Sequence, residues 1–161
     1  MIMEFEAYEQ VIGVIQSIVP GDSCCTQMIS VMTEDGMINF HVSADTMIID
    51  NVRLRRGMRI AAYYDRNLPT PAIFPPQYHA QLITVLRQNQ QVMLSYFDDS
   101  LLAEGGELQL NIGSATRMFT GNGQMFTCNP GGNVLLVYYT MTTRSIPPQT
   151  TPQRIIVLCA E

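Results

Sequence analysis

The sequence predicts an all-β fold of two small β-barrels that arise from an internal duplication and pack together. Segments of the first half recur in the second half in the same order. Apolar and polar residues alternate along these segments, which is the pattern of a strand with one buried face. No stretch combines a 3.6-residue apolar period with helix caps. We therefore expect many short strands and little helix.

The repeat consists of four blocks that recur in one order. Residues 34–46 (EDGMINFHVSADT) match residues 104–116 (EGGELQLNIGSAT) at a spacing of 70 without a gap. The other matches are 57–65 with 132–140, Pro75-Pro76-Gln77 with Pro147-Pro148-Gln149, and 83–85 with 155–157. The duplicated unit is ~75 residues long, a length at which one unit alone buries little surface. We predict one barrel in residues 1–87 and the second in residues 88–161.

Strand positions follow from the alternation and from the turns that bound it. Ile38, Phe40 and Val42 form the apolar row of one strand, and the corresponding row is Leu108, Leu110 and Ile112. Gly and Asp in residues 34–36 and 104–106 suit hairpin turns because they tolerate positive φ. The predicted strands are 8–19, 26–33, 37–42, 58–64 and 81–86 in the first unit, and 91–97, 107–112, 133–139 and 154–159 in the second.

The strand order suggests an OB-type barrel in each unit. Five short strands, with the longest connection between the third and fourth, match that outline, and closure removes exposed edges. That connection, residues 44–56, looks extended rather than helical, so the barrel should be minimal. A two-sheet sandwich across both units is the alternative. Residues 134–137 and 155–158 are apolar on both faces, so we expect the sister unit to cover them, or a second copy of the chain in a homodimer.

The composition limits the function. The chain has 161 residues, 47% apolar and 14% charged, with a formal net charge of −5. All its basic residues are arginines, which excludes lysine Schiff-base chemistry and a P-loop. The acidic balance disfavours nucleic acid as a partner. There is no nucleophile elbow, zinc-protease motif or phosphate cradle, so we predict a protein that is not an enzyme.

A tyrosine pair followed by Pro-Pro-Gln is the most distinctive motif. Neighbouring strand residues face opposite sides, so Tyr64 and Tyr139 should enter the core, and Tyr63 and Tyr138 should face outward. An exposed tyrosine beside an arginine and a rigid proline turn suits recognition of a protein or a glycan. The alternative is that the tyrosine only packs on the prolines. The predicted partner-binding residues are Tyr63, Arg66, Gln77, Tyr138, Arg144 and Gln149.

The second copy of this motif carries a family resemblance. Tyr138-Tyr139-Thr140 followed by residues 143–149 (TRSIPPQ) resembles a motif of uncharacterised repeat proteins of spore-forming Firmicutes. Those proteins are similar in repeating this unit, sometimes beside a domain like the amino-terminal part of copper amine oxidases. The resemblance covers both units and implies a β-barrel-like module without an established activity. The first unit lengthens the loop with residues 67–71 and lacks Arg-Ser-Ile, which favours Arg144 over Arg66 as the centre of a site.

An arginine cluster supports an alternative function. The cluster precedes Tyr63, and basic groups near exposed aromatic rings are how OB-folds hold single-stranded nucleic acid. The second unit has no counterpart in residues 120–134, and acids such as Asp45 and Asp50 are available as ion-pair partners. A solvated turn is therefore the competing interpretation. The residues of the cluster are Arg53, Arg55, Arg56 and Arg59.

Metal ligands are not grouped in the sequence. His41 and His79 lie far from any paired ligand, and His41 falls on the outward side of its strand. Adjacent Cys24 and Cys25 would point to opposite faces of an extended segment. With Cys128 and Cys159 they are predicted to be buried or half-buried thiols. The acidic residues between 98 and 107 lack the oxygen spacing of a calcium loop. We predict a solvated hairpin there, no metal and no cofactor.

The expected location follows from missing signals. No run of ~18 apolar residues is present, so no membrane span is expected. Residues 1–10 (MIMEFEAYEQ) are acidic and lack the basic and apolar regions of a signal peptide, which predicts a cytoplasmic protein. The Firmicutes resemblance implies secretion or association with the cell envelope as the alternative.

Overall fold

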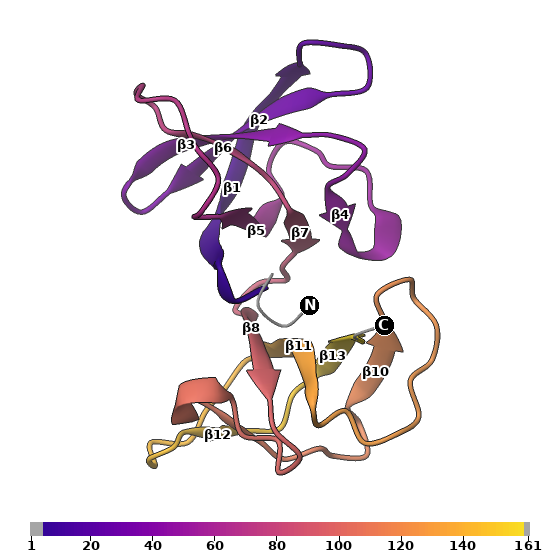
Figure 1. The fold of residues 1–161 in the computed structure, drawn as a ribbon. Coiled ribbons are helices and arrows are strands. Elements are labelled where there is room, and N and C mark those ends of the chain that lie inside the picture. The colour runs from indigo at the N-terminus through magenta and orange to yellow at the C-terminus, as the bar shows by residue number, and fades with distance from the viewer. Residues whose placement is uncertain (1–4, 160–161) are drawn as a thin grey trace. The chain divides into compact units, whose positions relative to one another are not determined.

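A computed structural model of the chain describes residues 5–159, and the start of the acidic N-terminal segment, residues 1–4, lies outside them. The described residues divide into a unit at Ala7–Arg87, the N-terminal unit, and a unit that begins at Gln88 and also includes residues 5–6, the C-terminal unit. Residues 5–6 are helical, and all other regular secondary structure in the described residues consists of strands and short 3-10 turns (Figure 1). The predicted all-β class is confirmed. No helix in residues 5–159 is long and apolar enough to traverse a bilayer.

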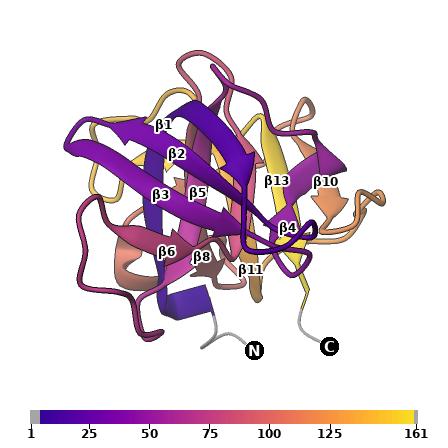
Figure 2. The same cartoon turned by 90° about the horizontal axis from the view of Figure 1, so that it is seen from above.

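The N-terminal unit is built on one sheet of seven strands within the described residues. Its centre is an antiparallel meander of three neighbouring strands (Figures 1 and 2), with a bulge between Ile15 and Ser17. The sheet order is β4-β7-β5-β1-β2-β3-β6. The strands are β1 (Tyr8–Pro20), β2 (Gln27–Thr33), β3 (Gly36–Val42), β4 (Met47–Ile48), β5 (Arg59–Asp65), β6 (Gln77–His79) and β7 (Leu82–Val85), and a 3-10 turn, η1 (Ile49–Asn51), follows β4.

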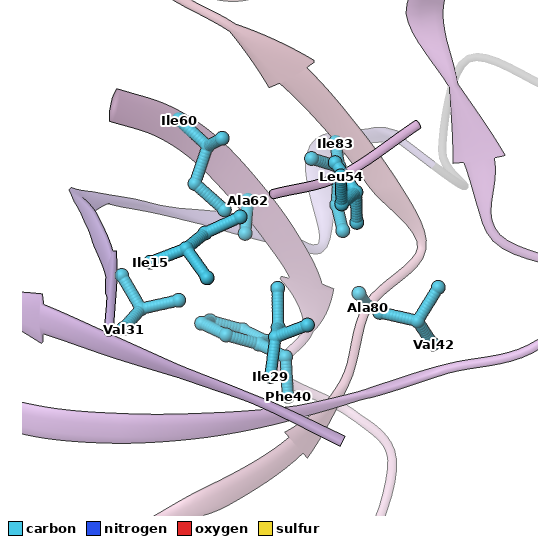
Figure 3. Close-up of a cluster of buried hydrophobic side chains, with 10 residues drawn as sticks. All are labelled: Ile15, Ile29, Val31, Phe40, Val42, Leu54, Ile60, Ala62, Ala80 and Ile83. Atoms are coloured by element: carbon cyan, nitrogen blue, oxygen red, sulfur yellow. The ribbon is translucent and has the colours of Figure 1, made fainter. Parts of the chain in front are cut away.

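Alternating apolar residues of these strands form the core of the N-terminal unit. Phe40 is fully buried in the row that the sequence predicts, between Ile38 and Val42. Ile29 of β2 and Ile60 of β5 are also fully buried in this cluster (Figure 3). Burying one such side chain stabilises the fold by about 1.5–3 kcal/mol. The period-2 interpretation of the first unit is therefore confirmed.

The predicted closed barrel is not formed. Residues 77–85, which would close it, divide into β6 and β7, and these pair at different places in the sheet. The chain crosses between them at Ala80, whose N–H donates to His41 O (2.9 Å), and Gln81, whose N–H donates to Tyr63 O (2.7 Å). Because the ladder is interrupted there, the sheet keeps β4 and β6 as edges in the described residues.

The C-terminal unit contains, in the described residues, a four-stranded sheet of order β10-β13-β11-β8 and a separate β9-β12 pair. Its buried cluster includes Phe97, Leu135 and Val137. No closed barrel is present here either, because the β9-β12 pair does not join the larger sheet. The elements are β8 (Gln91–Phe97), η2 (Glu104–Gly106), β9 (Gln109–Leu110), β10 (Arg117–Thr120), β11 (Asn133–Tyr139), β12 (Gln149–Thr150) and β13 (Arg154–Leu158).

The predicted strand at residues 107–112 is shorter in the structure, where β9 covers only Gln109 and Leu110. Glu104–Gly106 forms a 3-10 turn in which Gly105 has a φ of 81°. The residues on both sides of it pair as a short hairpin, because Leu102 and Gln109 form an antiparallel bridge and Ala103 N–H donates to Leu108 O (2.8 Å). Leu108 and Leu110 are buried as predicted, but Ile112 is 37% exposed. The strand β9 ends at Leu110, so the alternation no longer places residue 112 against the core.

The two units repeat one set of strand pairings. The parallel pair β4-β7 aligns Met47 with Leu82, and the parallel pair β10-β13 aligns Arg117 with Arg154. The other shared pairings are antiparallel β5-β7 and β11-β13, antiparallel β1-β5 and β8-β11, and parallel β3-β6 and β9-β12. The long β1-β2-β3 meander has only isolated bridges as its counterpart. The C-terminal unit is thus a shortened version of the same pattern.

Candidate recognition loops

Each unit carries one long connection that ends in the two prolines of Pro-Pro-Gln, and we call these two connections the proline loops. They are residues 66–76, between β5 and β6, and residues 140–148, between β11 and β12. Each ends on the same contact, because Asn39 N–H donates to Pro76 O and Gln109 N–H donates to Pro148 O, both at 2.9 Å. The first proline of each motif follows a cis peptide bond. The two loops are therefore anchored in the same way.

The proline loops display apolar side chains. Phe74 and Ile146, which immediately precede the first proline in each loop, are 89% and 100% exposed. Single exposed apolar residues are ordinary on protein surfaces. Half of the large apolar residues that are exposed within residues 5–159 lie in these loops, however, and the two most exposed occupy corresponding positions. The other apolar residues exposed in the loops are Leu68, Ile73 and Met141.

Hydroxyl groups hold the loop at residues 140–148 in one conformation. Thr143 N–H donates to Gln149 O, and Gln149 N–H donates back to Thr143 Oγ1, both at 2.9 Å. Ser145 Oγ donates to Pro147 O (2.8 Å), and Thr150 Oγ1 donates to Met141 O (2.6 Å). These bonds fix the backbone on both sides of Ile146, so its side chain projects from an ordered loop.

The loop at residues 66–76 is two residues longer and is tied mainly at its start. Asn67 N–H donates to Asp65 Oδ1 (2.9 Å), and Leu68 N–H donates to Asp65 O (3.1 Å). Arg66 forms an ion pair with Glu9 (3.7 Å) in which both side chains are about half exposed. An exposed pair of this kind contributes at most about 1 kcal/mol to stability.

The prediction that Tyr63 and Tyr138 are exposed is wrong. They lie on the strand face opposite the core clusters, as expected, but they are only 2% and 1% exposed. Tyr63 OH donates to Gln10 Oε1 (2.6 Å), and the Arg154 guanidinium lies over the Tyr138 ring at 5.2 Å. The physical reason is that the outward rows of β5 and β11 are themselves buried, since Ala61 and Leu136, on the same faces as these tyrosines, are 0% exposed.

Tyr64 and Tyr139 lie on the core side, as predicted. Tyr139 is part of the C-terminal cluster, and burial raises its pKa. Tyr64 packs against the N-terminal cluster, where its ring stacks on Tyr78 with centroids 3.8 Å apart. Burial, followed by a hydrogen bond to Tyr78, raises the pKa of Tyr64 to about 12. Both tyrosines are therefore structural.

The two predicted glutamines also have structural partners. Gln149 Oε1 accepts from Asn111 Nδ2 (3.0 Å), and Gln77 Oε1 accepts from His41 Nε2 (3.3 Å). These are corresponding side-chain pairs beside the parallel strand pairs of the two units. Of the six residues proposed from the sequence, Arg144 is the one exposed side chain that lies within the ordered loop at residues 140–148.

The two histidines form a polar row that the sequence did not suggest. His41 and His79 are aligned partners of the parallel β3-β6 pair. The Gln81 Nε2 amide donates to His79 Nδ1 (3.3 Å), so His79 Nε2–H faces Ser43 Oγ (3.0 Å). The imidazole thus presents a proton to the serine rather than removing one. The two histidines are far apart in the sequence, and a parallel strand pair joins distant segments, so the sequence alone does not predict that they are neighbours.

The arginine cluster is partly held by backbone carbonyls. Arg56 Nε donates to Gln16 O (3.1 Å), and Arg59 Nη1 donates to Arg87 O (3.3 Å). Arg53 and Arg55 are exposed. A shallow, open surface depression lies beside Arg56, lined by Gln16 and Gly57 among others. Tyr63, the aromatic residue nearest in sequence, is buried and offers no ring for base stacking.

The cysteines are exposed, which contradicts the predicted burial. All four lie in turns, loops or just beyond a strand end, where side chains reach solvent: Cys24, Cys25, Cys128 and Cys159. Within residues 5–159 no three His, Cys, Asp or Glu side chains are grouped as metal ligands.

In the acidic segment, Asp98 Oδ1 accepts from the N–H groups of Ser100 (2.9 Å) and Leu102 (3.0 Å), so this carboxylate stabilises a turn.

The fold and the loops together define a class: an all-β protein of two sheet-based units, each with one exposed proline loop. The sequence matches no family model, and no curated protein is similar to it. The particular function therefore has to be inferred from the loops themselves.

Proposed function

We propose that this protein is a non-enzymatic binding or assembly module that recognises a protein or a glycan through its two proline loops. The observation that carries the proposal is the exposure of Phe74 (89%) and Ile146 (100%) at corresponding loop positions. Leaving two large apolar side chains in water has no benefit for folding. Burying either one in a partner would contribute about 1.5–3 kcal/mol.

The loop at residues 140–148 is the better-formed binding element. Its hydroxyl network orders the backbone before a partner arrives, which lowers the entropic cost of binding. Ile146 supplies an apolar anchor, and the exposed Arg144 supplies a planar group with five hydrogen-bond donors. A protein pocket with a carboxylate beside it, or the apolar face of a sugar with hydroxyl groups around it, suits this combination.

The repeated pairings support a duplication of one ancestral unit. Two copies of the loop would give two binding sites on one chain, and linked sites can exceed the affinity of either one by about 10²–10⁴-fold. The buried outer rows of β5 and β11 favour a cover by protein, for which the sister unit is our first candidate and a homodimer the second. The resemblance to Firmicutes repeat proteins is consistent with a repeated module outside catalysis.

The test compares two variants of the full chain that differ in where an apolar side chain is lost. In the first, Phe74→Ser and Ile146→Ser remove both loop anchors. In the second, Met125→Ser removes a residue that is 71% exposed outside the proline loops. Both are screened on a glycan array and in affinity capture, beside the unsubstituted chain, with thermal unfolding as the folding control.

The proposal predicts that the loop variant loses a ligand that the Met125→Ser variant retains, with unchanged melting temperatures. Retention of every ligand by the loop variant would overturn it. Tyr138→Ala is unsuitable as a binding test because this side chain is buried.

The exposed Arg53 and Arg55 favour a second candidate, binding of single-stranded nucleic acid. A fluorescence titration with a labelled oligonucleotide at several salt concentrations tests it, because phosphate binding weakens steeply with salt. Tight binding that is lost in an Arg53→Gln and Arg55→Gln variant would favour this candidate over the loops.

A further inference from the structure

Cys24 and Cys25 occupy the two central positions of the turn that joins β1 to β2. Thr26 N–H donates to Ser23 O (3.2 Å), which closes a four-residue turn around the two cysteines. Both side chains are exposed. The sequence interpretation placed them on an extended segment, where neighbours face opposite sides. Because the two cysteines lie in a turn and not in an extended strand, the alternation rule does not apply to them, and their thiols need not face opposite sides.

The turn is held without any contribution from the thiols. Ser23 N–H donates to Thr26 Oγ1, and Cys25 N–H donates to Ser23 Oγ, both at 3.2 Å. Gly21 N–H donates to Thr26 O (2.9 Å), and a Cβ on Gly21 would collide with Thr26 Oγ1. Free cysteines are usually buried as small apolar residues. Two adjacent cysteines in water therefore contribute reactivity rather than packing.

A stable disulfide between these neighbours is disfavoured by covalent geometry. Consecutive Cα atoms are about 3.8 Å apart across a trans peptide. Disulfides usually join Cα atoms about 4.4–6.8 Å apart, and shorter spans are strained and easily reduced. The pair is thus better suited to hold one larger atom between its sulfurs than to form a direct S–S bond.

We propose that Cys24 and Cys25 form a vicinal dithiol site that binds a single soft, thiophilic centre, represented by trivalent arsenic, through both sulfurs. With an arsenoxide R–As=O, two As–S bonds form and the As=O and both S–H bonds break. The oxide oxygen leaves with the two thiol protons as one water. Arsenic stays trivalent and sulfur keeps its oxidation state, so no oxidant or reductant is needed.

Two sulfurs on adjacent residues distinguish this site from the single thiols of the chain. Once one As–S bond has formed, the second is intramolecular, and such linkage raises apparent affinity by about 10²–10⁴-fold. Cys128 and Cys159 are also exposed but have no cysteine neighbour in sequence, so they serve as internal controls. This site does not depend on the proline loops.

The experiment uses phenylarsine oxide as the probe and intact-mass spectrometry as the readout. One variant, Cys128→Ser with Cys159→Ser, keeps the vicinal pair, and a second, Cys24→Ser with Cys25→Ser, keeps the single thiols. Each is loaded with the probe and challenged with rising 2-mercaptoethanol. The single substitution Cys25→Ser removes one sulfur of the pair, and melting temperatures confirm that the variants are folded.

The unsubstituted chain and the variant with the vicinal pair should keep one adduct at about 100-fold higher monothiol than the other variants. The adduct should be released by 2,3-dimercaptopropanol, which offers two sulfurs. Loss of the adduct at the same monothiol concentration in all variants would overturn the proposal, as would retention by Cys25→Ser.

Discussion

Thr46 and Thr116 make the same pair of hydrogen bonds at corresponding positions of the two units. Each Oγ1 accepts a backbone N–H from three residues earlier, Ser43 or Gly113, at 3.1 Å. Each also donates to a carbonyl of the segment after the parallel strand pair, at 2.8 Å for Ala80 O and 2.7 Å for Pro152 O. The threonine that ends the longest repeated block therefore joins two distant segments in both units.

Replacing either threonine by valine should destabilise the protein. Thr46→Val keeps the shape of the side chain but leaves Ser43 N–H and Ala80 O without this partner. The loss of a buried hydrogen bond costs about 1–3 kcal/mol. Urea unfolding of Thr46→Val and Thr116→Val measures it. Thr142→Val, at an exposed loop position, is the control and should stay within about 0.5 kcal/mol of the unsubstituted chain. Equal stability of all three variants would contradict the assigned role.

Gly13→Ala should be poorly tolerated. A Cβ at Gly13 would collide with Met32 O and lie 2.6 Å from Val31 Cγ1, next to the end of the β1-β2 pair where Val14 is aligned with Met32. Forcing an extra methyl group into contacts this close costs about 1–3 kcal/mol. Gly121→Ala provides the comparison, because its Cβ would meet only Leu158 Cδ2, at an ordinary 3.4 Å. A thermal shift of similar size in both variants would show that close packing at Gly13 is not the cause.

Tyr64 makes stability depend on pH at the alkaline end. Its pKa is about 12 in the folded protein and 10.0 in the unfolded chain. Above pH 10 the unfolded chain loses this proton first, so the contribution of Tyr64 is complete below pH 10 and is lost between pH 10 and about 12. Urea unfolding of Tyr64→Phe should decline less over this range than that of the unsubstituted chain. Parallel curves for both proteins would contradict the half-buried, hydrogen-bonded state of Tyr64.

Tyr138 and Ile146 should respond in opposite ways to truncation. Tyr138 is 1% exposed, so Tyr138→Ala should cost about 3–5 kcal/mol, as for other buried aromatic residues. Ile146 is 100% exposed, so Ile146→Ala should change the free energy of unfolding by less than about 0.5 kcal/mol. Differential scanning calorimetry of the two variants separates these cases. A marked destabilisation by Ile146→Ala would indicate that the loop tip is a packing element.

The strands could be predicted because the apolar–polar alternation and the internal sequence repeat indicate the same elements. Residues 91–97 and 133–139 are strands with the predicted bounds, and the predicted core row around Phe40 is buried. Closure was not predictable from alternation. It depends on whether residues 77–85 form one ladder or two, and the break at Ala80 and Gln81 has no period-2 signature. The short strand β10 was missed for the same reason, since four residues carry little pattern.

The repeat identifies the two proline loops, but the exposure predicted for Tyr63 and Tyr138 is wrong. Repetition of Pro-Pro-Gln indicates the loops. The alternation of side chains along a strand shows on which face Tyr63 and Tyr138 lie, but it does not show whether that face is exposed to solvent. Phe74 and Ile146 were overlooked because an apolar residue is first interpreted as core. The feature that could have revealed them is their shared position, one residue before the repeated prolines.

The central claim is that both units share one hydrogen-bonded framework from which a proline loop projects. Amide hydrogen exchange, measured residue by residue by NMR, tests it most directly. The backbone N–H groups of Asn39 and Gln109, and those of Gln81 and Gln153, donate to corresponding carbonyls and should be protected as matched pairs. The amides of Phe74 and Ile146 should exchange much faster. Protection of these donors in only one unit, or strong protection at both loop tips, would contradict the claim.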